Sequence, residues 1–135
     1  MQIEELFGES LADLRTGMKI DMDTLAVHEK NLLIFWSPTC EFCKKFFRNN
    51  LNSNVVGIFC FPITDDLEYT VYYLNQHNIT YPQLVSLDSG TVHSIDAQFV
   101  SAVPTFYIVT SNGEILMKQQ GINEIDNLIE TLYKN

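Results

Sequence analysis

Positive charge is scarce in this sequence, which disfavours two classes of partner. The 135 residues include 8 Lys and Arg against 17 Asp and Glu, so the net charge is −9. Binding to nucleic acid or to an anionic membrane surface requires a basic patch, and the largest cationic group is Lys44-Lys45 with Arg48. We therefore expect no nucleic-acid partner for this chain.

Long apolar runs are absent as well. No apolar stretch approaches the roughly 20 residues needed to span a bilayer, so we expect no membrane insertion of this chain. The first residues, Met-Gln-Ile-Glu-Glu-Leu, lack the basic and apolar segments of a signal peptide. A cleaved leader would leave no trace, so export remains open. The composition, 46% hydrophobic and 19% charged, is that of a folded globular protein.

Cysteine is rare, and its count limits the chemistry. Three cysteines are an odd number, so they cannot form a fully paired disulfide framework within one chain. Cys60 lies in the apolar segment 55–62, where a buried thiol packs as a small hydrophobic group. Cys40 and Cys43 could supply half of a zinc site, but no second Cys-x-x-Cys exists and the three histidines are scattered. We therefore expect no metal site.

The sequence does contain a Cys-x-x-Cys pair between a predicted buried strand and a predicted helix. Residues 31–36 form an apolar run typical of a strand buried on both faces. Ser37-Pro38-Thr39 ends this run, and Cys40 and Cys43 follow at the start of a helix-compatible segment. The unpaired N–H groups of a helix N-terminus stabilise an anion, and the thiolate is the reactive form of cysteine. This arrangement indicates redox chemistry.

The rest of the chain predicts an alternation of strands and helices. We expect a weak helical segment over 1–18, an edge strand at 19–23, and a capped turn beginning at Asp23 or Thr24. The next predicted elements are a helix over 43–51, a strand at 54–61, a helix over 65–77, an extended segment at 83–87, a short helix or irregular turn over 92–100, a strand at 105–109, its partner at 114–119 and a final helix after Gly121. Asn112-Gly113 predicts a hairpin with a type I′ turn.

Four motifs occur in the order Phe35–Lys45 with its cysteine pair, Tyr81-Pro82, Val103-Pro104-Thr105 and the hairpin Ser111–Ile115. Together they resemble the thioredoxin fold and, within it, the TlpA/ResA-type bacterial thiol–disulfide oxidoreductases. The resemblance covers about residues 19–133. It implies a single α/β domain over 1–135, with 1–18 as an N-terminal extension. The implied architecture is a thioredoxin-like three-layer α/β/α sandwich, a mixed central sheet and an antiparallel C-terminal hairpin.

The resemblance also implies an activity. The chain would reduce protein disulfides, with Cys40 as the nucleophile and Cys43 as the resolving thiol. The Cys40–Cys43 disulfide would be the only redox group, without a bound cofactor. Partners would be protein thiols and disulfides and an upstream electron donor. The location implied is the bacterial periplasm, although the cytoplasm is not excluded by cysteine usage.

Several residues around the dithiol are implied to contact substrate. Pro104 is expected to follow a cis peptide bond facing the dithiol, and the backbone of Val103 to pair with an extended substrate segment. Trp36 is expected to pack beside the dithiol, so that its fluorescence reports the redox state. The full set of implied substrate-binding residues is Trp36, Pro38, Thr39, Glu41, Phe42, Val103 and Pro104.

Two departures from the family pattern leave the rate and direction of electron flow open. Thioredoxin has an Asp six residues before its first cysteine, where this chain has Ile34. ResA-like proteins have a Glu six residues after that cysteine, where this chain has Phe46. Cys43 would then lose its proton to water or to another carboxylate, with Asp21 and Asp23 as loose candidates.

Two other functions remain as alternatives. One is a thioredoxin-like module that binds a partner through Val103-Pro104 without catalysis, which the absent proton acceptors favour and the cysteine pair disfavours. The other is a thiol peroxidase. Ser37 fits the position three residues before the peroxidatic cysteine, but Leu33 stands where that family has proline.

Overall fold

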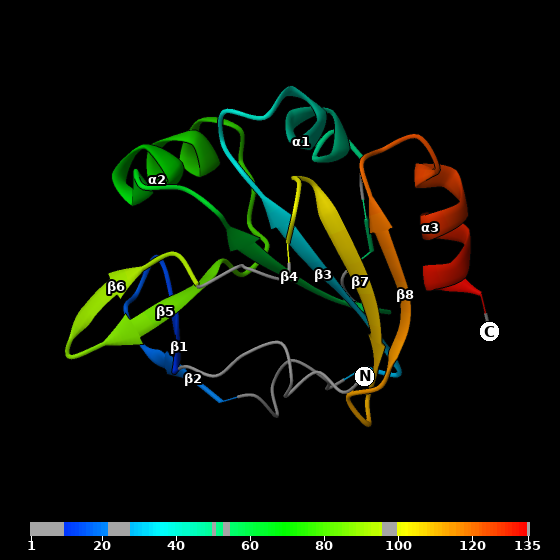
Figure 1. Cartoon of the computed structure of the whole chain (residues 1–135), viewed down its shortest axis with the longest axis horizontal. Helices are drawn as coiled ribbons and strands as arrows, with labels where there is room; N and C mark the ends of the chain where they lie inside the picture. Colours follow the sequence, from blue (N-terminus) through cyan, green and yellow to red (C-terminus); the bar gives the residue numbers. More distant parts are fainter. Residues whose placement is uncertain (1–9, 22–27, 50, 53–54, 96–99, 135) are drawn as a thin grey trace.

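The computed structural model describes residues 10–21, 28–49, 51–52, 55–95 and 100–134 (Figure 1). Within these ranges the chain alternates short strands with three helices. In chain order the elements are β1 Leu11–Asp13, β2 Lys19–Ile20, β3 Lys30–Trp36, α1 Glu41–Phe46, β4 Gly57–Pro62, α2 Leu67–Gln76, β5 Leu84–Asp88, β6 Thr91–His93, β7 Thr105–Thr110, β8 Ile115–Gln120 and α3 Ile125–Tyr133.

The strands form a mixed central sheet and a smaller antiparallel sheet. The central sheet has the order β4-β3-β7-β8, with β3 and β4 parallel and the other pairs antiparallel. The smaller sheet has the order β2-β1-β5-β6. A parallel bridge between Cys60 of β4 and Gln83, just before β5, connects the two sheets. The α/β class, the mixed sheet and the antiparallel C-terminal hairpin are therefore as the sequence predicted.

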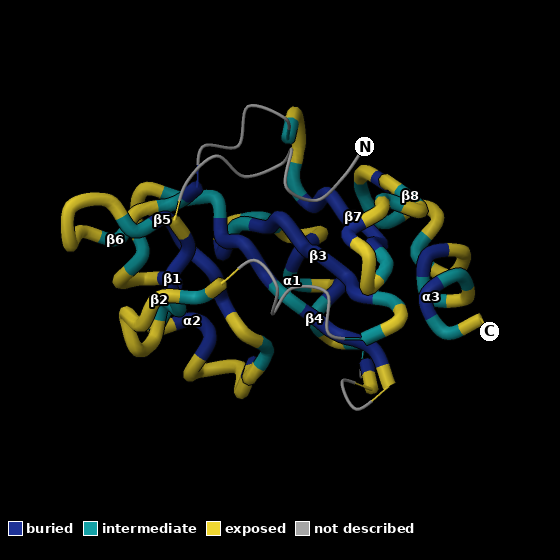
Figure 2. Tube along the Cα trace, turned by 90° about the horizontal axis from the view of Figure 1, so that it is seen from below, coloured by how far each residue is buried: buried dark blue, intermediate teal, exposed yellow. Residues whose placement is uncertain are grey.

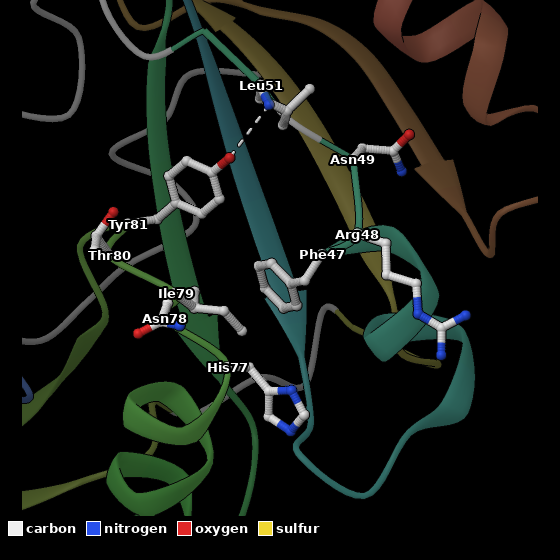
Figure 3. Close-up of a pocket in the computed structure, with 9 residues that line it drawn as sticks. All are labelled: Phe47, Arg48, Asn49, Leu51, His77, Asn78, Ile79, Thr80 and Tyr81. Atoms are coloured by element: carbon white, nitrogen blue, oxygen red, sulfur yellow. Dashed lines mark hydrogen bonds between the residues drawn. The ribbon is translucent and has the colours of Figure 1, made fainter.

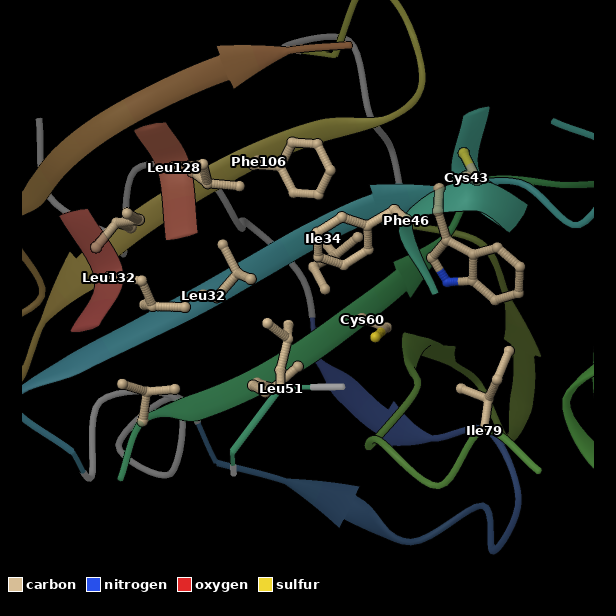
Figure 4. Close-up of a cluster of buried hydrophobic side chains, with 14 of the residues drawn as sticks. Leu32, Ile34, Cys43, Phe46, Leu51, Cys60, Ile79, Phe106, Leu128 and Leu132 are labelled. Atoms are coloured by element: carbon tan, nitrogen blue, oxygen red, sulfur yellow. The ribbon is translucent and has the colours of Figure 1, made fainter. Parts of the chain in front are cut away.

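All three described helices pack on one face of the central sheet. Cys43 and Phe46 of α1 and Leu128 and Leu132 of α3 lie against the strands in one apolar cluster (Figure 4). Tyr73 and Leu74 of α2 belong to the same cluster. β3 and β4 are parallel, and β4 has a parallel bridge to the residue before β5, so α1 and α2 are crossover helices. Crossovers of the usual right hand that proceed in one direction along a sheet place their helices on the same side, as observed here. The other face is packed by residues of β1, β2, β5 and the segment after β6, and no helix among the described elements covers it.

The central position of β3 explains its apolar sequence. Residues 31–36 are buried along the whole strand, which has a neighbour on each edge (Figure 2). Asn31 is the polar exception, and its Nδ2 donates to the backbone carbonyl of His28 at 2.8 Å. Its partner across the sheet is Gly57, where a Cβ would lie 2.1 Å from Asn31 Oδ1. The amide therefore fits only because residue 57 has no side chain.

Two local predictions were wrong because strand pairing outweighed weak local patterns. Residues 11–13 are a strand rather than part of a helix, since they pair with both β2 and β5 and bury Leu11 and Ala12. Residues 91–93 form β6, a hairpin partner of β5, rather than a helix or irregular turn. The predicted caps at Asp23 and Thr24 lie outside the described residues.

The hairpin at Asn112-Gly113 exists, but its turn is not type I′. The N–H of Gly113 donates to the carbonyl of Thr110 at 2.9 Å, and Gly113 has φ +82°. Among the described non-glycine residues, only Asn78 and Ser89 have positive φ, so Asn112 does not adopt the I′ geometry. The turn is a three-residue connection ending in a left-handed glycine, a common alternative for the same sequence.

Candidate active site

The cysteine pair lies where β3 ends and α1 begins. Cys40 is the N-cap of α1, with extended backbone angles, and its Sγ accepts a hydrogen bond from the N–H of Cys43 at 3.2 Å. The N–H of Cys40 donates to the carbonyl of Ser37 at 3.1 Å, which closes the turn between strand and helix. An N-cap atom that accepts from the first helical turn is stabilised as an anion. The sulfur of Cys40 therefore lies at the N-terminal end of α1, facing the N–H groups of its first turn.

The two thiols of the pair differ in accessibility. Cys40 is half-buried, whereas Cys43 is 1% exposed in the cluster beneath α1. Burial raises the pKa of the Cys43 thiol well above its ordinary value, and the hydrogen bond with Cys40 adds to this effect. Cys43 is therefore a neutral thiol in this state. Cys40 alone can meet a large substrate at the surface.

A loop from the other end of the chain lies against Cys40. The thiol of Cys40 donates to the carbonyl of Val103 at 3.7 Å, and the Val103–Pro104 peptide bond is cis. The carbonyl of Pro104 accepts from the N–H of Gly121 at 2.8 Å, and Thr105 Oγ1 donates to the carbonyl of Ala102. These bonds fix the loop at the start of β7. The backbone of Val103 is thereby positioned beside the reactive sulfur.

Trp36 lies in the core beneath the dithiol. Its side chain is 1% exposed, and its ring contacts Phe47 and Tyr73 at centroid distances of 4.9 and 5.8 Å. The indole Nε1 donates to Gln83 Oε1 at 2.9 Å. A side chain so deeply buried packs under the cysteines and presents no surface to a substrate.

The other residues expected at the substrate surface differ in exposure. Thr39 is exposed and its hydroxyl lies 3.0 Å from that of Ser37, whereas Pro38 is buried. Phe42, between the two cysteines, is 54% exposed. The carboxylate of Glu41 is also exposed and forms an ion pair with Lys44 at 3.4 Å. Phe42 and Glu41 therefore form the outer rim next to Cys40.

The two positions at which related families have a proton acceptor hold buried apolar side chains in this structure. Ile34 is fully buried, and Phe46 packs on Phe106 with ring centroids 4.7 Å apart. Asp21 is exposed directly after β2 in the smaller sheet, and Asp23 lies outside the described residues. Among the groups that shift the pKa of Cys43 there is no carboxylate from the described part of the chain.

Cys60 is a buried packing residue, as the sequence predicted. It is fully buried in β4 opposite Ile34, and its N–H donates to the carbonyl of Pro82 at 2.9 Å. Burial raises the pKa of its thiol to about 12. A neutral, inaccessible thiol is chemically inert.

Two buried glutamines near the site were not identified from the sequence. Gln83 is the hydrogen-bond partner of Trp36. The only sign of this role in the sequence is that Gln83 is a polar residue at the start of an apolar segment. Gln119 lies opposite Phe106 in the central sheet, and its side-chain oxygen and nitrogen have no hydrogen-bond partner among the described residues. The contact of Gln83 joins segments 47 residues apart, whereas Gln119 lies within the β7–β8 hairpin.

Comparisons with known proteins agree with this geometry. Residues 20–134 match the family described as "Thioredoxin-like domain". The chain therefore belongs to the thioredoxin-like domain family. A search of curated protein sequences found no match.

Solved structures that are similar to this fold include bacterial thiol–disulfide oxidoreductases, at low sequence identity. DsbF of Mycobacterium tuberculosis matches with a TM-score of 0.70 and 16% identity, over 91% of each chain. A secreted disulfide oxidoreductase of the same organism, homologous to E. coli DsbE, has a TM-score of 0.66 and 15% identity, over 96% of this chain and 97% of that one. StoA of Bacillus subtilis has a TM-score of 0.60 and 18% identity, over 89% and 94% of the two chains.

In the described part of the chain, no group of three or more His, Cys, Asp or Glu side chains is placed to hold a metal ion. None of the helices in these ranges is long and apolar enough to cross a membrane.

Proposed function

We propose that this chain is a thiol–disulfide oxidoreductase that reduces disulfides of protein substrates. One observation carries the proposal: the accessible Cys40 is the N-cap of α1, and the buried Cys43 donates its N–H to the Cys40 sulfur at 3.2 Å. A reactive outer thiol and a protected inner thiol on one helical turn are the two parts that disulfide exchange requires.

The reaction begins at the outer thiol. The Cys40 thiolate attacks one sulfur of a substrate disulfide, an S–S bond to Cys40 forms, and the substrate's own S–S bond breaks. The departing substrate thiolate takes a proton from water. The helix N-terminus stabilises the attacking thiolate, and the raised pKa of Cys43 keeps the second thiol protonated during this step.

The second step releases the substrate. Cys43 loses its proton to water and attacks the Cys40 sulfur, which forms the Cys40–Cys43 disulfide and frees the second substrate thiolate. Two electrons have then moved from the enzyme to the substrate. An upstream dithiol donor must return them, so we propose a thiol-bearing electron donor as the other partner.

Substrate would be held at the rim of the dithiol. The backbone of Val103, beside the Cys40 sulfur, could pair with an extended segment as an added strand does. Thr39, Glu41 and Phe42 would form the contact surface, with Pro38, Pro104 and Trp36 shaping it from below. The location we propose is the bacterial periplasm, in keeping with the secreted M. tuberculosis neighbour.

A redox titration tests the activity. The protein is equilibrated with glutathione buffers, and Trp36 fluorescence follows the dithiol beneath which it packs. Because the negative Glu41 adjoins Cys40, we expect a reversible two-electron transition between about −220 and −280 mV. A potential above about −150 mV would contradict the reducing direction.

If no Cys40–Cys43 disulfide forms, the alternative is a non-catalytic binding module. Undiminished partner binding and function in the variant Cys40→Ser/Cys43→Ser would establish that alternative.

A further inference from the structure

A groove runs between the end of α1 and the end of α2, next to the dithiol. One cavity of about 310 Å³ is lined by Lys44, Phe47, Arg48, Tyr73, His77 and Ile79. A second cavity, of about 350 Å³, shares four of these residues and extends along the segment 77–81. Figure 3 shows the two walls of the second cavity, with Phe47 and Arg48 on the α1 side and His77 to Tyr81 on the α2 side. We call these two cavities together the α1–α2 groove.

The base of the groove is continuous with the active site. Phe47 and Tyr73 both contact the ring of Trp36, the last residue of the strand that leads to Cys40. Lys44 follows Cys43 directly, and its Nζ lies 5.9 Å from the centre of the Tyr73 ring. The α1 wall of the groove therefore begins at Lys44, about one helical turn after Cys40.

The charge of the groove is opposite to that of the whole chain. Lys44 and Arg48 contribute cationic groups, and no Asp or Glu is among the described residues that line the two cavities. The chain as a whole has 17 acidic residues and only 8 Lys and Arg. The lining of the groove is therefore cationic in a protein that is acidic overall. Glu41, which lies outside the lining, offsets part of the Lys44 charge at 3.4 Å.

The far wall is held in place by a third cation. The guanidinium of Arg15 donates to the backbone carbonyls of Ile79 and Tyr81, and the Tyr81 hydroxyl accepts from the N–H of Leu51 at 3.3 Å. These bonds connect the β1–β2 turn, the segment after α2 and the segment after α1. The groove is thus preformed, which lowers the entropy lost when a ligand binds.

We propose that the α1–α2 groove binds an acidic segment of the protein whose disulfide is reduced. This proposal rests on the proposed function, because it assigns a substrate feature to the same site. From Cys40 to Arg48 is eight residues, or about 12 Å along a helix, a distance that three or four extended substrate residues span. Acidic side chains about three to five positions from the substrate cysteine would therefore meet Arg48 and Lys44.

The net charge of −9 does not prevent this binding. At physiological ionic strength the Debye length is about 8 Å, so distant carboxylates are screened while cations in contact with the ligand are not. The same net charge disfavours a second copy of this chain as the occupant, since two such chains repel each other.

Two matched synthetic peptides test the proposal. Each carries one cysteine as a mixed disulfide with a chromogenic thiol, and positions three to five after the cysteine are Asp in one peptide and Asn in the other. The reduced protein is mixed with each peptide, and release of the chromogenic thiol gives the rate constant. We expect the acidic peptide to react about tenfold faster at low salt, with the ratio falling towards one in high salt.

Charge variants assign the effect to the groove. Arg48 is exposed, so Arg48→Glu and the milder Arg48→Gln should fold, and both should bring the rate ratio close to one. The control is Lys118→Glu, the same charge change at an exposed residue beside Tyr107, which packs on the opposite face of the sheet. This variant should keep the ratio of the unmodified protein.

The possible outcomes separate the two proposals. Equal rates for both peptides, or a ratio that Arg48→Glu leaves unchanged, would overturn the groove assignment while the activity stands. Failure to reduce either peptide would instead contradict the proposed function. Self-association in sedimentation experiments that Arg48→Glu abolishes would identify a second copy as the occupant and also overturn the assignment.

Discussion

The indole Nε1 of Trp36 donates a 2.9 Å hydrogen bond to Oε1 of Gln83, joining the last residue of β3 to the residue before β5. Both side chains are buried, and Gln83 also forms the bridge to Cys60 and donates from Nε2 to the carbonyl of Tyr81. This bond therefore connects the central sheet to the smaller sheet directly beneath the dithiol.

Replacing Gln83 should weaken this connection. The variant Gln83→Leu leaves the indole N–H buried without its acceptor, so we expect the free energy of unfolding to fall by about 1–3 kcal/mol. Urea unfolding followed by circular dichroism measures the change. Trp36→Phe removes the donor, and the double variant should lose less stability than the sum of the two single losses. Strictly additive losses would show that the hydrogen bond contributes no coupling.

The three thiols should react in a defined order. Cys40 is the accessible thiol, whereas Cys43 and Cys60 are buried with raised pKa values. In the reduced native protein, iodoacetamide at neutral pH should modify Cys40 at least about a hundredfold faster than the other two, as measured by peptide mass spectrometry. All three should react at similar rates in denaturant, which serves as the control. Rapid native modification of Cys60 would contradict its assignment as an inert thiol.

Removing one thiol of the pair should separate their roles. Cys43→Ser should accumulate a mixed disulfide between Cys40 and a model disulfide protein, because the resolving thiol is absent. Cys40→Ser should accumulate none, since the buried Cys43 cannot reach the substrate. Non-reducing electrophoresis reads both results. Equal trapping by the two variants would show that Cys43 also attacks substrate.

The stability of the reduced protein should fall in alkali. Burial keeps the Cys43 and Cys60 thiols neutral in the folded state, whereas both ionise near pH 9 in the unfolded chain. A raised pKa gives stability that is fully present below pH 9 and is lost as pH rises from 9 towards 12. Between pH 8 and pH 10 each thiol should account for a loss of about 1 kcal/mol.

The variant Cys60→Ala isolates one of these contributions. Other groups titrate in the same range, so the comparison uses the difference between the variant and the unmodified protein under reducing conditions. Urea unfolding at pH 8 and pH 10 should show a shallower alkaline loss in Cys60→Ala. Parallel pH dependences would mean that the Cys60 thiol ionises as easily in the folded state as in the unfolded one.

Gly57 should tolerate no side chain. In Gly57→Ala the new Cβ would meet Asn31 Oδ1 at 2.1 Å and Phe59 Cε2 at 2.9 Å, so Asn31 must move from its hydrogen bonds in β3. We expect a loss of about 2–4 kcal/mol in the free energy of unfolding. Gly121→Ala is the comparison, because a Cβ there meets nothing within 4 Å and only its φ of +74° is unfavourable. Its cost should be about 1–2 kcal/mol.

The central strand and the dithiol were predictable from sequence because their determinants are local. Residues 32–36 are apolar whichever neighbours they have, and Pro38 with the N-cap position of Cys40 fixes the change from strand to helix. The cap of α2 was equally local, since Asp66 accepts from the N–H of Tyr69 three residues later. The hairpin at Gly113 was found for the same reason, although the choice among hairpin turns depends on the strands it joins.

Tertiary structure alone decided the features that join distant segments. Leu11–Asp13 is a strand because it pairs with β5, and the sequence of these three residues does not specify that partner. The contact of Cys40 with Val103 spans 63 residues, and the partner of Trp36 lies 47 residues away. The α1–α2 groove likewise exists only because crossovers of one hand place both helices on one face of the sheet. Local sequence determines which residues can be buried or reactive, whereas the packing of distant segments determines what those residues meet.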